Sequence, residues 1–231
     1  MRWLILLFPF FSLAQGDAKL LVTKAYNRFA QIQSYVADIQ MRFDIPGINM
    51  EPLSGKVYYK KPEKFRIYTK GIFFLPRQNP YFALQTLRDT QEFNAFLSGE
   101  EKVGETTCKI VNVFPSKADN DLILAKLWID EQRFLVHKAQ LTTRQNGTII
   151  MEQTFLKNAS NDALPQHIRF VIDMVKFKVP KAMTLELNAK SSKQEKSNAQ
   201  REVGEIHLSF SNYKINVVVS DTVFAETNRR L

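Results

Sequence analysis

The sequence predicts an α+β fold in which about ten antiparallel strands form one curled sheet and helices pack against its concave face. One early segment has a helical period, many later segments alternate between apolar and polar residues, and no strand–helix–strand repeat appears. A single sheet of this size normally curls or closes, which leaves a concave side. Because the helices also carry apolar faces that need cover, we expect them inside that concavity.

The first fourteen residues have the pattern of a secretory signal peptide. Arg2 supplies a positive charge, Trp3–Phe11 is an apolar run, and Ser12-Leu13-Ala14 places small residues at positions −3 and −1 of a cleavage site. The alternative, a buried or anchoring helix, is disfavoured because the run is about half the length of a membrane span and contains Pro9. We therefore expect residues 15–231 to be one soluble, periplasmic domain, with no cysteine at the cut to carry a lipid anchor.

Charge and cysteine content limit the possible binding partners and the possible sources of stability. The single cysteine, Cys108, excludes an intramolecular disulfide, so the fold must depend on apolar burial. The formal net charge of +9 suits acidic lipid headgroups, an acidic partner or nucleic acid. Secretion argues against nucleic acid. The charges are spread along the chain, so an ordinary solvated basic surface is the alternative interpretation.

The helical period covers Asp17–Gln33, with Asp17 as the expected N-cap. A short helix is predicted from Asn79 to about Leu87, and the polar segment Asn188–Glu202 is predicted to be a mobile loop. Asn146-Gly147 indicates a hairpin turn. The predicted strands are Ser34–Asp44, Gly55–Lys60, Lys64–Lys70, Glu92–Leu97, Cys108–Phe114, Leu122–Asp130, Phe134–Arg144, Thr148–Lys157, His167–Met174, Phe177–Leu187, Gly204–Asn212 and Val217–Val219.

Residues capable of catalysis do not form a recognisable motif. His137, His167 and His207 all fall in predicted strands, and none has the spacing of a metal site. Cys108 sits in an alternating strand, where a small core residue is the usual role. No Gly-x-Ser-x-Gly, phosphate-binding glycine loop or Cys-x-x-Cys occurs. We therefore expect neither an enzyme nor a bound cofactor or metal.

The apolar residues are more informative. Eighteen Phe, seven Tyr and six Met could simply fill a core, or they could line a wide cavity that adapts to a flexible acyl chain. The stretch Ile72-Phe73-Phe74-Leu75, just before Pro76, favours the cavity. An apolar loop is costly in water unless it covers or receives something apolar.

Three segments together resemble the LolA-type outer-membrane lipoprotein-sorting proteins. Residues 55–66 resemble the family signature Gly-x-φ-x-φ-x-basic-Pro-x-x-Phe-Arg, where φ is an apolar residue. Leu127-Trp128-Ile129-Asp130 resembles a second family segment that precedes a hairpin. The carboxyl-terminal pattern is matched by Phe210, Tyr213, Asn216, Asp221 and Phe224. The resemblance spans nearly the whole expected mature chain.

The resemblance implies a half-open antiparallel β-barrel with helices covering a hydrophobic cavity. Members of the family accept lipoproteins from an inner-membrane export complex, shield their acyl chains and deliver them to an outer-membrane acceptor, with transient contact at membrane surfaces. A related branch consists of lipid-sensing regulators of envelope stress. A structural envelope protein whose interior is only a packed core is a third possibility.

We expect the lipid-binding lining to come from the apolar face of the first strand and from the two strands after it. Ile72, Phe73, Phe74 and Leu75 are the expected cover. Lys61 occupies the position before the motif proline, where the best-known carriers have an arginine that can fasten the lid by forked hydrogen bonds. The predicted lining residues are Tyr35, Ala37, Ile39, Met41, Phe43, Val57, Tyr59, Phe65 and Ile67.

Overall fold

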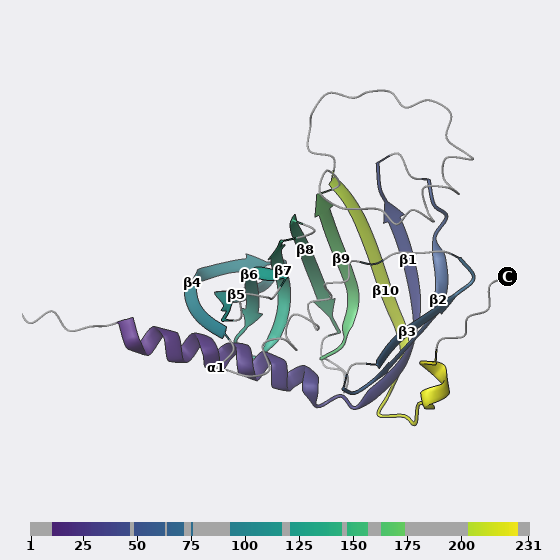
Figure 1. Cartoon of the computed structure of the whole chain (residues 1–231), viewed down its shortest axis with the longest axis horizontal. Helices are drawn as coiled ribbons and strands as arrows, with labels where there is room; N and C mark the ends of the chain where they lie inside the picture. The colour runs from purple at the N-terminus through teal and green to yellow at the C-terminus, as the bar shows by residue number, and fades with distance from the viewer. Residues whose placement is uncertain are drawn as a thin grey trace, which may run out of the picture.

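A computed structural model describes residues 11–46, 49–62, 64–71, 75, 93–116, 121–144, 147–156, 163–173 and 203–225. Within them lie one long helix, ten strands and a short 3-10 helix (Figure 1). The helices are α1 (Phe11–Ala30) and η1 (Asp221–Val223). The strands are β1 (Ser34–Asp44), β2 (Leu53–Lys60), β3 (Lys64–Thr69), β4 (Phe93–Val103), β5 (Thr106–Pro115), β6 (Leu122–Asp130), β7 (Leu135–Thr143), β8 (Gly147–Phe155), β9 (Pro165–Asp173) and β10 (Val203–Ile215).

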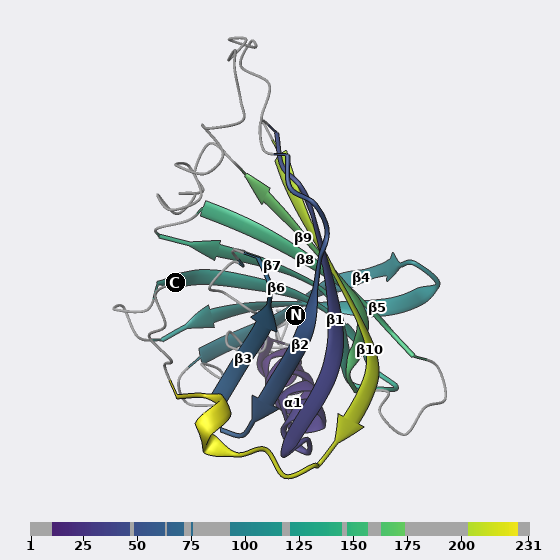
Figure 2. The ribbon, with the colours of Figure 1, turned by 90° about the vertical axis from the view of Figure 1, so that its right-hand side faces the viewer.

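All ten strands form one antiparallel sheet in the order β3-β2-β1-β10-β9-β8-β7-β6-β5-β4. The sheet is open, with β3 and β4 at its two edges, and the pairing of β1 with β10 joins the beginning of the sequence to its end. Figure 2 shows the strong twist, with β1, β2 and β10 running steeply while β5–β8 run nearly crosswise. The predicted curled antiparallel sheet with a helix against it is confirmed.

One face of the sheet forms the core. Along β1 the buried side chains alternate with exposed ones, as a period of two requires. The helix α1 packs mainly on β4, reaches β6 and β7, and buries its own apolar stripe there. The members of that stripe are Ala18, Leu21, Val22, Ala25 and Phe29.

The boundaries of the helix differ from the prediction. It begins at Phe11 and ends at Ala30, so Asp17 lies inside it, exposed, and is not its N-cap. The end of the helix at Ala30 is followed by contacts with residues that are remote in the sequence. The backbone N–H of Gln33 donates to Asn216 Oδ1, and the Ser34 hydroxyl donates to the Val217 carbonyl, so both residues are held by the carboxyl-terminal segment.

That same segment is not the predicted strand. Val217–Val219 pairs with no described strand, and instead the Val217 carbonyl accepts from the Ser34 hydroxyl and the Val219 carbonyl accepts from Lys60 Nζ. The expected hairpin between β7 and β8 is confirmed, and Gly147 adopts the positive φ (68°) that such a turn favours. The predicted helix near 79–87, the strand 177–187 and the loop 188–202 lie outside the described residues.

Candidate functional site

The register of β1 brings most of the predicted lining residues together. Tyr35 pairs with Tyr59 and Ala37 with Val57 across β1 and β2, and the apolar face continues onto β10. All seven predicted residues of β1 and β2 are buried in one hydrophobic cluster. The added members from β10, which the sequence did not single out for the lining, are Ile206, Leu208 and Phe210.

The edge strand β3 extends this face. Phe65 pairs with Tyr59 and Ile67 with Val57, and both are half-buried against the cluster. The β3 backbone approaches β2 very closely at Gly55, where a Cβ atom would lie 2.1 Å from the Tyr68 carbonyl oxygen. Only glycine fits at this position without a shift of the backbone.

Aromatic rings concentrate where the end of α1 meets the sheet. The rings of Tyr35 and Tyr59 stack with centroids 5.2 Å apart, and Phe29 of α1 lies 5.6 Å from Tyr59. Tyr213 of β10 lies edge-on to Tyr35 at 5.6 Å and near-parallel to Phe210 at 6.1 Å. Burial raises the pKa of Tyr35 far above its ordinary value, so its phenol stays neutral in this apolar setting.

Lys61 holds the end of the helix. Its Nζ donates to the Ala30 carbonyl at 2.9 Å, and its backbone N–H donates to the Gln33 carbonyl at 2.8 Å. A cation at the carboxyl end of a helix is stabilised by the helix dipole. An ammonium contact therefore helps to fasten the turn between β2 and β3 to α1, at a position where an arginine could offer a fork.

Of the expected cover, only Leu75 is among the described residues. It is half-buried and packs against the same hydrophobic cluster as the lining. Ile72, Phe73 and Phe74 lie outside the described residues. The covering role of all four stays a prediction.

Cys108 and His137 carry side chains of a type that can act in catalysis, and both are buried in the sheet. Cys108 is buried beside Ile110 and Trp128 in a second, small cluster, and burial raises the pKa of its thiol to about 12. A thiol with that pKa is not a nucleophile at neutral pH. His137 is buried, and desolvation lowers its pKa. Within the described part of the chain, no three His, Cys, Asp or Glu residues are grouped so that they could hold a metal ion.

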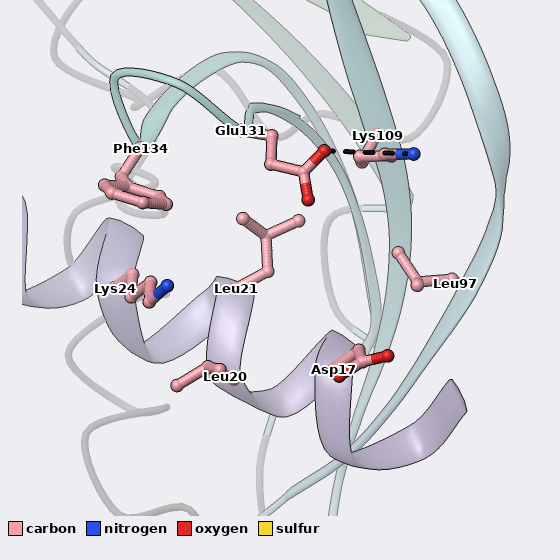
Figure 3. Close-up of a pocket in the computed structure, with 8 residues that line it drawn as sticks. All are labelled: Asp17, Leu20, Leu21, Lys24, Leu97, Lys109, Glu131 and Phe134. Carbon is pink, nitrogen blue, oxygen red and sulfur yellow. Dashed lines mark ion pairs between the residues drawn. The ribbon is translucent and has the colours of Figure 1, made fainter. Parts of the chain in front are cut away.

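A cleft of about 310 Å³ lies between the first half of α1 and the sheet (Figure 3). Leu20 of α1, which is 52% exposed, and Leu97 of β4 line different walls of the cleft, and Lys24 Nζ lies 4.9 Å from the centroid of the Phe134 ring. Lys109 Nζ lies 3.8 Å from a carboxylate oxygen of Glu131, and both residues lie on the sheet side of the cleft (Figure 3). No local pattern could have revealed this cleft, because it exists only once α1 lies against the turn between β6 and β7.

Comparison with known proteins identifies the fold. No family model matches the sequence, and no curated protein matches it. Among solved structures, a DUF1329 family protein from Desulfovibrio piger ATCC 29098 is similar with a TM-score of 0.59 and 13% identity, over 93% of this chain and 98% of that chain. A LolA superfamily protein from Nitrosomonas europaea has a TM-score of 0.56 and 12% identity, over 90% and 97% of the two chains. The fold is LolA-like.

A third solved structure agrees. A domain from Vibrio parahaemolyticus, assigned to the outer membrane lipoprotein-sorting proteins, has a TM-score of 0.59 and 8% identity, over 90% of this chain and 96% of that chain. The LolA-like fold, inferred from segments 55–66 and 127–130 and from the carboxyl-terminal pattern, is therefore confirmed at the level of architecture. Among the described helices, none has the length and apolar character needed to cross a bilayer.

Proposed function

We propose that this chain is a periplasmic carrier that shields the acyl chains of lipoproteins, or of other envelope lipids, and delivers them towards the outer membrane. The observation that supports this most is the continuous apolar face of β10, β1, β2 and β3. It holds all nine predicted lining residues in or against one cluster, while α1 packs mainly on the opposite edge of the sheet, at β4. The acyl chains bind against this face.

The chemistry of the face suits a flexible apolar ligand. Each methylene removed from water stabilises the complex by about 0.8 kcal/mol, so an acyl chain cannot cross an aqueous compartment without a shield. Rings such as Tyr35, Tyr59 and Phe210 offer large contact areas, and Met41 can change conformation to fill gaps. The role requires no bond to be broken, and thus no catalytic group, metal or cofactor.

The remaining parts of the proposal follow from the sequence. Residues 1–14 direct export and are removed, and residues 15–231 act as the carrier domain. An inner-membrane export complex is the donor, and an outer-membrane protein or membrane is the acceptor. Ile72–Leu75 covers the bound chain, and Lys61 fastens the neighbouring turn to α1 through Ala30.

The first experiment is native mass spectrometry of the protein purified from a bacterial periplasm, followed by lipid extraction and transfer to acceptor vesicles. We expect co-purified lipid or lipoprotein that moves to the vesicles. A chain that stays empty and also fails to bind a fluorescent fatty acid contradicts the proposal. Binding without transfer, together with a regulatory protein whose affinity changes with lipid, would instead identify a lipid-sensing regulator.

A matched pair of variants locates the bound chain. Ala37 and Ala95 are both almost completely buried, but Ala37 lies on β1 and Ala95 on β4, against which α1 packs. Ala37→Leu adds bulk to the proposed lining and should weaken fatty-acid binding about tenfold. Ala95→Leu adds the same bulk beneath the helix and should leave the Kd of the folded protein unchanged. Equal effects of the two variants would rule out this location.

A further inference from the structure

The outer face of the β2–β3 hairpin is rich in positive charge. Lys56 and Lys60 on β2 and Lys64 and Arg66 on β3 alternate with the inward-facing apolar residues, and Lys70 follows directly. An open groove of about 720 Å³ runs along this hairpin. The groove is lined by Pro52, Leu53, Ser54, Gly55, Lys56, Tyr58, Tyr68, Thr69 and Lys70.

The carboxylates that pair with these cations are fewer than the cations. Lys60 and Lys64 share the single carboxylate of Asp221, at 2.8 and 2.9 Å, and Lys56 pairs with Asp38 at 2.7 Å. Within the described part of the chain, these five cations thus have two paired carboxylates. Among the described residues of this face, positive charge stays in excess even when Glu51, which is exposed just before β2, is counted.

Amphipathic aromatic groups lie among the charges. The rings of Tyr58 and Tyr68 meet edge to face at 5.6 Å, and the Arg66 guanidinium lies 5.7 Å from the Tyr68 ring centroid. Tyr68 is 43% exposed, and its hydroxyl donates to the Val223 carbonyl. Next to Val219, whose carbonyl accepts from Lys60, Val218 is fully exposed.

We propose that this outer face, with Val218, docks the protein onto a membrane surface that contains anionic phospholipid. Tyrosine is enriched at the membrane–water interface, and clustered Lys and Arg are attracted to anionic headgroups. An exposed valine beside the cations can enter the headgroup region. Docking here places β3, an edge strand of the described sheet (Figure 2), beside the lipids, and Phe65 and Ile67 of that strand pack against the apolar cluster.

The docking surface extends the proposed carrier role but does not depend on it, because the charged side chains and the acyl-binding side chains lie on opposite faces of the same strands. A protein that docks need not hold an acyl chain. The Ala37→Leu protein therefore separates the carrier proposal from the docking proposal. It should bind fatty acid more weakly, but it should bind vesicles as the unmodified protein does.

The test is co-sedimentation of the complete mature chain with vesicles of phosphatidylcholine containing about a third of phosphatidylglycerol, and with phosphatidylcholine alone. Lys70→Glu changes the charge of the docking face by two. We expect it to weaken binding to the anionic vesicles at least tenfold, since each charge near such a surface contributes roughly fivefold. Lys102→Glu is the matched control, because Lys102 is exposed on β4 at the opposite edge of the sheet.

Val218→Asp is a second variant at a fully exposed side chain, so it should fold normally and still weaken binding. Added salt should weaken the binding of the unmodified protein. The proposal is wrong if that protein binds both kinds of vesicle equally, or if Lys70→Glu and Lys102→Glu have equal effects. Retention on immobilised polyglutamate without vesicle binding would likewise overturn it in favour of an acidic protein partner.

Discussion

The two halves of the sheet use different side chains on the same inner face. Beneath α1, strands β4, β6 and β7 present the small residues Ala95, Ala125 and Ala139 together with aliphatic side chains and the ring of Phe93. On the other half, β1, β2 and β10 present Tyr35, Tyr59 and other large side chains. Small residues let a helix approach a surface closely, whereas large rings and methionines can pack against a ligand of variable shape.

This difference separates a half in which α1 covers the sheet, here called the structural half, from the half that we propose binds acyl chains, here called the binding half. The structural half has its cover built in as α1, whose position is set by complementary packing. The binding half meets α1 at Phe29, which contacts Tyr59, and at Lys61, which bonds to Ala30. Substitutions should therefore cost mainly stability in the first half and mainly ligand affinity in the second.

The largest effect is expected for Phe93→Ala in the structural half. Phe93 is completely buried on β4, and its removal should lower the free energy of unfolding by about 3–5 kcal/mol. Phe65→Ala, at the half-buried edge of the binding half, should cost less stability but weaken fatty-acid binding more. Chemical denaturation and probe titration of both variants give the comparison. The expected difference between the two halves is wrong if Phe65→Ala lowers the free energy of unfolding as much as Phe93→Ala does.

Gly55→Ala tests how tightly β3 is held to the binding half. Its new methyl group would collide with the Tyr68 carbonyl, so the β2–β3 hairpin must open. We expect a loss of about 1–3 kcal/mol, measured by urea unfolding, and faster amide exchange confined to β2 and β3. Unchanged exchange in the hairpin would show that the two strands are not closely joined.

Lys61→Ala tests the contact between the halves. Loss of the ammonium at the carboxyl end of α1 should cost about 0.3–1 kcal/mol. Lys61→Arg keeps the cation and should retain the stability of the unmodified protein. If the alanine variant is as stable as the arginine variant, the contact does not stabilise the end of the helix.

The smallest effect concerns acid. Hydrogen bonds from Lys60 and Lys64 lower the pKa of Asp221 to about 2. Because the unfolded value is near 4, the stability from this carboxylate is present above about pH 4 and is lost as the pH falls through about 2. Asp221→Asn should therefore lower the Tm slightly at pH 6, and this difference should shrink as the pH falls towards 2 and vanish below it. A pH-independent difference would exclude the ionised carboxylate as the cause.

The sequence predicts those features that depend on local period. The alternation from Tyr35 to Phe43 correctly placed five residues on one buried face, and the turn at Gly147 lies where expected. The end of α1 could not be predicted, because it depends on Asn216, which is remote in sequence. The conformation of Val217–Val219 could not be predicted either. Its apolar residues are typical of a strand, but the Val217 and Val219 carbonyls accept hydrogen bonds from side chains.

The sequence predicted which residues belong to the candidate lipid-binding face better than it predicted how those residues are arranged in space. Alternation identified Val57 and Tyr59 as inward-facing, but it could not indicate that Gly55 lies against the β3 backbone or that Lys61 binds the helix. It also missed the contribution of β10 to the lining. These features arise from strand order and tertiary distance, neither of which has a periodic signal.

The pairing of β1 with β10 has a consequence for the order of folding. The sheet cannot be completed until the chain has been synthesised as far as Ile215, because β10 is the strand that joins β1 to β9. Contacts this distant in sequence form slowly, because a long loop must first be closed. The half of the sheet that contains β1, β2 and β3 therefore stays separate from β9 until β10 has paired with both of its neighbours.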